Sequence, residues 1–480
     1  MKTKLYIIIA FIGALFTGCD KYLDVAPDDR QEVESLEDVA ELAANSYSEG
    51  SYNFIEWLTD NAAAISDNTQ YPWLHENFMW EPVKAYEGQD TPTHFWSNTY
   101  TAIAHANQAL EEIEKIEYDN SDTEYRNAIK GEALLTRAYN HFMLASVFCV
   151  HYDQATASSA MGIPYIKAPE TELIVKYERG TLKETFDNVE SDLIEGLALL
   201  SDNYYKGSGK YHFNLNAANA LASRFYLYKK DYATCISYAN KVLGEGTLPT
   251  VFVRDMNEVF TGTSSAEMGT KFTDPNRPSN LLLVRKETGY VTRANSGYQA
   301  NTAIFNEIFK NSIQGETDYR DKRYWYGGDA RFQPKFIELF RYTTATTGYP
   351  YFINPELRSE EVVFNRMEAN VMTGNLDKAL DDYNVFAPTR YSKGGQLSSE
   401  DIAAFYGDYS QESMMKFIIA ERRKEFLREG LRWFDVKRFN MTFEHTNVIG
   451  ESSILTENDL RKAVQIPAGA IEKGIEANPR

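Results

Sequence analysis

Two segments rich in aromatic residues carry the side chains best suited to binding a sugar. A flat aromatic ring covers the apolar face of a pyranose, while neighbouring polar side chains bond to its hydroxyl groups. One segment, YPWLHENFMW, spans residues 71–80, and the other spans residues 290–326. The candidate ligand-binding residues in them are Tyr71, Trp73, His75, Trp80, Tyr290, Tyr298 and Trp325. For each ring, the alternative is packing beneath a loop.

The sequence offers no pattern for catalysis or for a metal. A glycoside hydrolase needs two carboxylates across the bond that it cleaves, and no segment singles out such a pair among the 69 acidic residues. The seven histidines form neither an HExxH pattern nor a cluster with cysteine, which argues against zinc. The acidic run at Asp377, Asp381 and Asp382 lacks the spacing and central glycine of an EF-hand. We therefore expect a binding protein that has no cofactor and is not an enzyme.

The charge of the chain narrows the class of ligand. Its 480 residues carry a formal net charge of -20. This acidity opposes binding to nucleic acid, whose phosphates attract clustered Lys and Arg. It also favours a neutral ligand over a polyanionic one, although one basic pocket would suffice for an anionic ligand.

The N-terminus is typical of an exported lipoprotein. Two lysines precede the apolar run at residues 5–16, which is too short to span a bilayer and so indicates a signal peptide over residues 1–18. Thr17 and Gly18 then lead to Cys19, as in a lipobox, although Phe16 stands where that motif prefers leucine. We expect Cys19 to be diacylated and residues 19–30 to form a polar tether. The alternative is an ordinary signal peptide that leaves Cys19 free.

Most of the remaining chain shows the 3.6-residue periodicity of amphipathic helices. We expect one mostly α domain over residues 31–480, built on tetratricopeptide-like helical hairpins with long irregular loops and few short strands. The hairpins should occupy about 31–243 and 356–440, and a loop-rich insertion about 244–355. The clearest hairpins are predicted at residues 97–149, 216–243 and 360–386.

Some residues are predicted to serve the core. Cys149 and Cys235 lie in helical apolar patterns, so we expect buried free thiols, with a disulfide between them as the alternative. Trp96 and Trp433 also lie in helical segments and should be buried.

A densely charged helix is predicted over residues 413–430, SMMKFIIAERRKEFLREG, with Gly430 as its C-terminal stop. Its charged residues, including Glu421, Arg422 and Glu425, are expected on the helix surface in ion pairs within the helix. A catalytic Glu–Arg pair is the alternative.

The segment ERRKEFLREGLRWFDVKRFN, residues 421–440, closely resembles the C-terminal signature of the SusD/RagB family. Further segments resemble the family in the expected order over nearly the whole chain after the signal peptide. They are CDKYLDVAP (19–27), FWSNTYTAIAHANQAL (95–110), GEALLTRAYNHFMLASVF (131–148), GIPYI (162–166), TLKETFDNVESDLIEGLALL (181–200), AANALASRFYLYKKDYATCISYANKVL (217–243) and IPAGAIEKGIEANP (466–479). One departure is VHYDQATASSAMGIP (150–164), which stands where many members have a compact Gly-Asp-Val-Pro turn.

This resemblance implies a surface-exposed lipoprotein of the outer membrane that has no catalytic chemistry. It implies a SusC-like TonB-dependent transporter as partner, on which the protein acts as a lid and captures a ligand for import. Oligosaccharides are the ligands of the best-known members, and peptides those of others. Residues 71–80 resemble the stretch from which sugar-binding members draw aromatic rings. Asp20 directly after the cysteine would favour the inner membrane in some bacteria, but the resemblance favours the outer membrane.

Two functions of other classes stay open. The chain could be a surface repeat scaffold that binds a protein or peptide partner without any glycan. It could also be a lipid-anchored glycan hydrolase.

Overall fold

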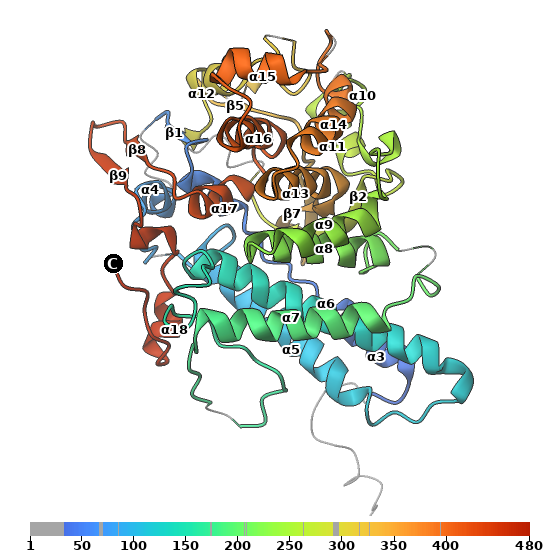
Figure 1. The fold of residues 1–480 in the computed structure, drawn as a ribbon. Helices are drawn as coiled ribbons and strands as arrows, with labels where there is room; N and C mark the ends of the chain where they lie inside the picture. Colours follow the sequence, from blue (N-terminus) through green and yellow to red (C-terminus); the bar gives the residue numbers. More distant parts are fainter. Residues whose placement is uncertain are drawn as a thin grey trace, which may run out of the picture.

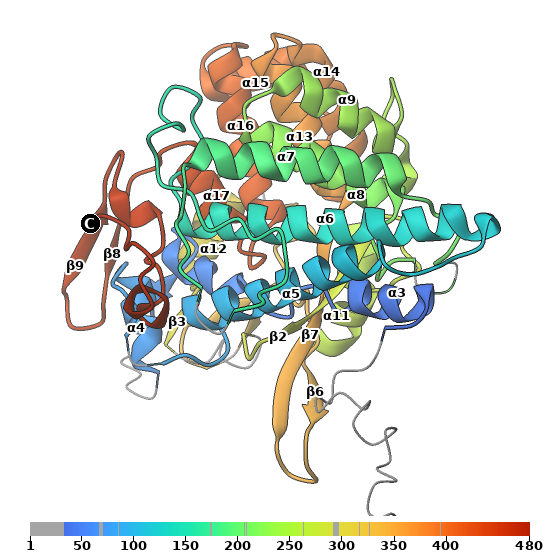
Figure 2. The same ribbon diagram turned by 90° about the horizontal axis from the view of Figure 1, so that it is seen from below.

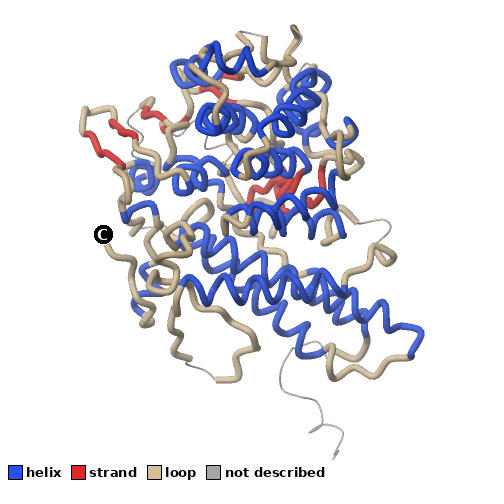
Figure 3. The backbone as a smooth tube through the Cα atoms, viewed as in Figure 1, coloured by secondary structure: helices blue, strands red, loops and turns tan. Residues whose placement is uncertain are grey.

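The computed structural model describes residues 33–480 apart from 67–70, 85, 173–174, 206, 208, 263, 291–296, 316, 326 and 394. These residues fold mostly as helices, with short strands between them (Figures 1 and 3). The mostly helical class predicted from the sequence is therefore confirmed. The predicted signal peptide and the lipidation residue Cys19 lie outside the described residues.

The first long helices pack side by side in one layer (Figures 1 and 2). Their bounds are α3 Leu36–Ala44, α5 Pro92–Glu112, α6 Thr123–Phe148 and α7 Leu182–Leu199. A capping box starts α7, because the Thr181 hydroxyl accepts from the Glu184 amide while the Glu184 side chain accepts from the Thr181 amide. Helices α6 and α7 cross at Gly131 and Gly196, where a Cβ on Gly131 would lie 2.9 Å from the Gly196 carbonyl oxygen. Glycine therefore lets the two backbones approach closely.

A second group of helices packs against this layer (Figure 1). Its bounds are α8 Leu215–Tyr228, α9 Tyr232–Leu243, α13 Ser359–Met372, α14 Leu376–Phe386, α15 Ser399–Tyr406, α16 Gln411–Glu425 and α17 Leu431–Arg438. Helix α13 packs on α9 and on α16. The turns between paired helices place Lys230 at φ 64° and Gly374 at φ 82°. The three predicted hairpins are thus present as α5–α6, α8–α9 and α13–α14.

The region between α9 and α13 holds short helices and most of the strands. The helices are α10 Met256–Phe260, α11 Ser265–Phe272 and α12 Thr302–Lys310, and the strands are β2 Asn280–Glu287, β3 Tyr298–Gln299, β4 Tyr324–Trp325, β5 Arg331–Phe332, β6 Leu339–Tyr342 and β7 Gly348–Arg358. Strands β2, β7 and β6 form an antiparallel sheet in that order. The β6–β7 hairpin projects from the body of the protein (Figure 2).

Short elements at both ends of the chain complete the fold. They are β1 Ala63–Ala64, α4 Pro72–Phe78, β8 Phe443–Thr446, β9 Ser452–Leu455 and α18 Ala468–Glu472. They lie together along one side of the molecule (Figure 1). Cys149 and Cys235 are buried free thiols, as predicted. Trp96 and Trp433 are also buried, as predicted.

Three charged residues in the C-terminal part of α16 are not at the surface, so the prediction for them is wrong. Glu421, Arg422 and Glu425 are all buried. Lys424 on the same helix pairs with Glu421 at 2.6 Å, but the other partners lie on other elements. An Arg320 nitrogen lies 2.8 Å from a Glu421 oxygen, and another lies 3.2 Å from a Glu425 oxygen. Arg390 also pairs with Glu425, at 2.8 Å. The sequence led us to expect exposed side chains because these partners are distant in the sequence. Helical periodicity gives information only about neighbours within one helix.

Candidate functional site

Strand pairing brings the two predicted aromatic segments together. Strand β1 pairs with β3, with Ala63 opposite Gln299 and Ala64 opposite Tyr298. The Ile65 amide then donates to the Gly297 carbonyl oxygen over 2.6 Å. The chain that leads into the first segment therefore lies against the middle of the second segment.

A third stretch joins the same place. The Arg331 amide donates to the Ala300 carbonyl oxygen over 2.9 Å, next to a bridge between Asn301 and Ala330. The turn between β4 and β5 also reaches the chain that precedes the first segment, because a Cβ on Gly328 would lie 3.3 Å from the Ile65 side chain. Both aromatic segments thus contribute to one region of the molecule.

Residues 72–78, within the first aromatic segment, form the short helix α4. Pro72 occupies the first turn, where its missing N–H costs no hydrogen bond. His75 projects from this helix, and its Nδ1 lies 2.8 Å from the Tyr298 hydroxyl oxygen. This hydrogen bond joins a side chain from each segment, and both Tyr71 and His75 remain partly exposed.

Four of the seven candidate residues are buried. The exposed fractions are 3% for Trp73, 4% for Trp80, 1% for Tyr290 and 3% for Tyr298. Trp80 stacks on His445 with ring centroids 4.4 Å apart, and its Nε1 donates to the Leu58 carbonyl oxygen over 2.9 Å. These positions favour packing over ligand contact for the four rings.

Trp325 has the opposite environment. Its side chain is 68% exposed although it lies on strand β4, directly opposite Arg331 on β5. The indole Nε1 donates to the Gly328 carbonyl oxygen over 2.8 Å, and this bond fixes the ring. A fixed and exposed indole can stack on a sugar with little loss of conformational entropy.

Tyr86 is a further exposed ring that the sequence analysis did not single out. It is 39% exposed and stacks on the buried Trp73, with centroids 5.4 Å apart and planes 8° from parallel. Its only sequence signal is its place in the loop that follows residues 71–80. The Tyr86 ring thus continues the stack from the buried Trp73 to the exterior of the protein. We call Trp325, Tyr86, Tyr71 and His75 the aromatic surface.

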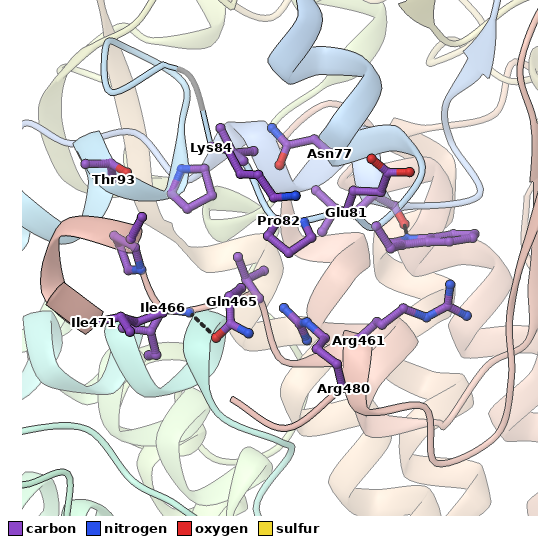
Figure 4. Close-up of a pocket in the computed structure, with 17 residues that line it drawn as sticks. Asn77, Glu81, Pro82, Lys84, Thr93, Arg461, Gln465, Ile466, Ile471 and Arg480 are labelled. Atoms are coloured by element: carbon purple, nitrogen blue, oxygen red, sulfur yellow. Dashed lines mark hydrogen bonds between the residues drawn. The ribbon is translucent and has the colours of Figure 1, made fainter. Parts of the chain in front are cut away.

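A pocket lies on another side of α4, between residues 81–93 and the C-terminal segment 461–480 (Figure 4). Its volume is about 260 Å³. Trp80 lines it, together with apolar and charged side chains that the sequence analysis did not identify. Among them are Asn77, Glu81, Pro82, Lys84, Arg461, Ile466, Pro467, Ile471 and Arg480.

Among the described residues, no group of three or more His, Cys, Asp or Glu could hold a metal ion. In the same part of the chain, no helix combines the length and the apolarity needed to cross a membrane.

Comparisons with known proteins agree with this architecture. A SusD superfamily protein of Bacteroides thetaiotaomicron superposes with a TM-score of 0.71 at 20% identity, over 93% of this chain and 100% of that chain. A SusD-like carbohydrate binding protein of Bacteroides vulgatus superposes with a TM-score of 0.67 at 16% identity, over 92% of this chain and 97% of that chain. At these identities the likeness shows the fold. No curated protein matches the chain.

Two family models match successive parts of the sequence. The model described as starch-binding associating with outer membrane matches residues 21–227. The model of the SusD family matches residues 230–467. Together they extend over nearly the whole sequence, and the chain belongs to the SusD family.

Proposed function

We propose that this protein is a cell-surface glycan-binding protein that delivers an oligosaccharide to a SusC-like TonB-dependent transporter. The aromatic surface is its ligand platform, and Trp325 is the central contact. The family membership supports the class of function. The observation that carries the site is the exposed Trp325 ring, which is held by its Nε1 bond to the Gly328 carbonyl oxygen close to Ile65.

The proposal includes a lipid anchor on Cys19 in the outer membrane. The model described as starch-binding associating with outer membrane begins its match at residue 21, which supports this location. Metabolic labelling with an alkyne fatty acid tests the anchor, and a chain that takes up no label overturns it. The transporter partner is tested by co-purification from detergent-solubilised membranes, where recovery of the protein without a large barrel overturns it.

Affinity electrophoresis of the chain lacking residues 1–19 against a panel of neutral polysaccharides tests the glycan platform. We expect retardation on one polymer, and we expect Trp325→Ala to weaken binding about tenfold, because an aromatic contact contributes about 0.5–1.5 kcal/mol beyond the apolar area that it buries. Tyr342 is a matched control, since it is 67% exposed on the separate β6–β7 hairpin. Tyr342→Ala should leave retardation unchanged.

The outcomes separate the candidate functions. Equal loss in both variants would assign the effect to general damage and would withdraw Trp325 as the contact. Absence of retardation on every polymer would favour the repeat scaffold, whose partner would then be a protein or peptide. That alternative has one structural support, a cavity of about 600 Å³ between α9, α13 and α14 that is lined by Asn240, Arg366 and Asn370. Turnover of a polymer by the purified protein would favour the hydrolase instead.

A further inference from the structure

The pocket between α4 and the C-terminal segment is separate from the aromatic surface. Among the described residues, its lining comes from Leu58, from residues 77–93 and from residues 461–480, and none comes from strands β1, β3, β4 or β5. Small-molecule pockets in proteins usually measure about 300–1,000 Å³. At about 260 Å³ this pocket suits a single ring rather than a chain of several sugars.

The pocket is basic, whereas the chain as a whole is acidic. Three basic side chains, Lys84, Arg461 and Arg480, line it beside one acidic residue, Glu81. The chain as a whole carries -20. Figure 4 shows Lys84 and Arg480 reaching toward the same space from opposite walls, with Arg461 to one side. A local concentration of positive charge in an acidic protein indicates a site for an anion.

Two of these cations have no carboxylate partner in the described part of the chain. Arg461 is held by Asp459, with a nitrogen–oxygen distance of 2.7 Å. Arg480 instead donates through Nη1 to two carbonyl oxygens, those of Leu460 at 3.2 Å and Ala463 at 2.8 Å. Burial, reinforced by the neighbouring charge of Arg461, lowers the pKa of Arg480. An anion in the pocket would offset both the lost hydration and the repulsion.

A buried polar group in the pocket has no hydrogen-bond partner. Asn77 on α4 is 3% exposed, and its Nδ2 is buried without an acceptor among the described residues. An unsatisfied donor of this kind costs free energy, and the described residues contain others, among them the Nε1 atoms of Trp57 and Trp433. Figure 4 shows Asn77 on the same wall as Lys84. Because water does not reach Nδ2, a ligand in the pocket would meet this side chain through its amide oxygen, which can accept from a sugar hydroxyl group.

Apolar and rigid walls complete the pocket. Pro82, Pro467 and Ile471 line it, together with Val83, Pro92 and Ile466. Such walls fit the C–H faces of a sugar ring, and the polar groups then fix its orientation. A free small anion such as phosphate would leave these walls without a partner.

We propose that this pocket binds one carboxylate-bearing sugar unit, a uronic acid, of an acidic glycan. The carboxylate lies between Lys84 and Arg480, and the Asn77 amide oxygen accepts from a sugar hydroxyl group. This inference rests on the proposed glycan-binding function and refines it, because it adds an acidic unit to the ligand. It also revises the expectation of a neutral ligand. That expectation allowed an anionic ligand only if the protein had a basic pocket, and this pocket is basic.

The test compares uronic acid oligomers with their own methyl esters, which keep the ring and lose the charge. The probes are the trimers of galacturonate, glucuronate and mannuronate, measured by isothermal titration with the chain lacking residues 1–19. We expect at least one acid trimer to bind about tenfold or more tightly than its ester, which corresponds to about 1.4 kcal/mol. The difference should shrink in 0.5 M NaCl, because exposed charges such as Lys84 and Arg480 are screened.

Variants locate the effect. Lys84→Met and Arg480→Met should each bring the affinity for the acid close to that for the ester, and should leave the affinity for the ester unchanged. Lys378→Met is the matched control, since Lys378 is an exposed lysine that lines a different cavity. Equal binding of acid and ester for all three trimers overturns the proposal, and so does an equal loss in the control variant.

The proposal and the glycan platform fail in distinguishable ways. Retardation on a neutral polymer that depends on Trp325, without any preference for acid over ester, leaves the platform and removes the uronate pocket. A preference for acid that depends on Lys84, without retardation on any neutral polymer, does the reverse. A third arm uses an N-acetylated tripeptide with a free C-terminal carboxylate. If it binds the pocket and no uronate does, the carboxylate belongs to a peptide and the sugar assignment is wrong.

Discussion

Buried ion pairs connect separate elements in the C-terminal half of the fold. Glu425 accepts from Arg358 over 2.8 Å and from Arg390 over 2.8 Å, and all three side chains are at most 2% exposed. Burying charge is costly, so such a pair is weak evidence of net stabilisation. Removing one partner is a different matter, because it leaves the other charges buried and uncompensated.

We predict that Glu425→Gln lowers the free energy of unfolding by about 3–5 kcal/mol, the usual cost of breaking a buried pair from one side. Urea denaturation followed by circular dichroism measures this change. Glu412→Gln is the matched control, because the Glu412–Lys416 pair lies on the same helix at 2.7 Å with both side chains largely exposed. It should cost less than about 0.5 kcal/mol. Equal effects of the two substitutions would contradict the argument.

The contact between α6 and α7 gives a prediction at the scale of elements. In an exposed helix, replacing glycine by alanine usually stabilises by up to about 1 kcal/mol. At Gly131 the added Cβ would meet backbone atoms of α7, the Gly196 oxygen at 2.9 Å and the Leu200 nitrogen at 3.0 Å. Neither backbone atom can rotate away, so the helices must separate.

Gly131→Ala should therefore lower the free energy of unfolding by about 1–3 kcal/mol, the usual cost of overpacking. Gly469→Ala in α18 is the control, because a Cβ there meets nothing within 4 Å. It should be neutral or slightly stabilising. Thermal unfolding of both variants checks the sign, and a stabilised Gly131→Ala would show that α6 and α7 can separate without loss.

Periodicity predicted the helical hairpins because apolar residues recur every three to four positions along α8–α9 and α13–α14. It could not predict α4, whose seven residues carry two turns of helix and are stabilised by distant contacts. The same limit applies to the site. Sequence spacing marked Trp73 and Trp325 alike, but burial of Trp73 depends on Trp57 and Tyr86, and exposure of Trp325 on the β4–β5 turn. The residue types could be predicted, and their exposure could not.

The buried carboxylates of the C-terminal half set the response of the whole molecule to acid. Burial opposes ionisation of Glu421, but Lys424 and Arg320 lower its pKa to about 2. Burial likewise opposes ionisation of Glu425, and Arg390 and Arg358 hold its pKa well below the usual range. The pKa of Glu360 and that of Asp435 are also lowered by neighbouring arginines, against the effect of burial.

The sign of the effect on stability follows from proton binding. Below about pH 5 the unfolded chain protonates these carboxyl groups, whose ordinary pKa is about 4, while the folded chain does not. The contribution of these carboxylates is therefore complete above that pH and is lost as the pH decreases toward 2. His141 acts in the same direction from about pH 6.5 downward, because burial lowers its pKa to about 3. Glu56 acts oppositely, since burial raises its pKa.

Two buried lysines do not alter this slope. Burial lowers the pKa of Lys335 to about 8 and that of Lys437 to about 7, so both are protonated in the folded and the unfolded chain below pH 5.

We therefore predict that the free energy of unfolding decreases steadily between pH 5 and pH 3. Urea titrations at half-unit steps of pH measure it. Glu421→Gln should be less stable at pH 7. Its free energy of unfolding should also decrease less steeply with falling pH, because one carboxyl group with a lowered pKa is gone. A curve parallel to that of the unmodified chain would mean that Glu421 titrates alike in both states, and would remove the buried network as the cause of acid sensitivity.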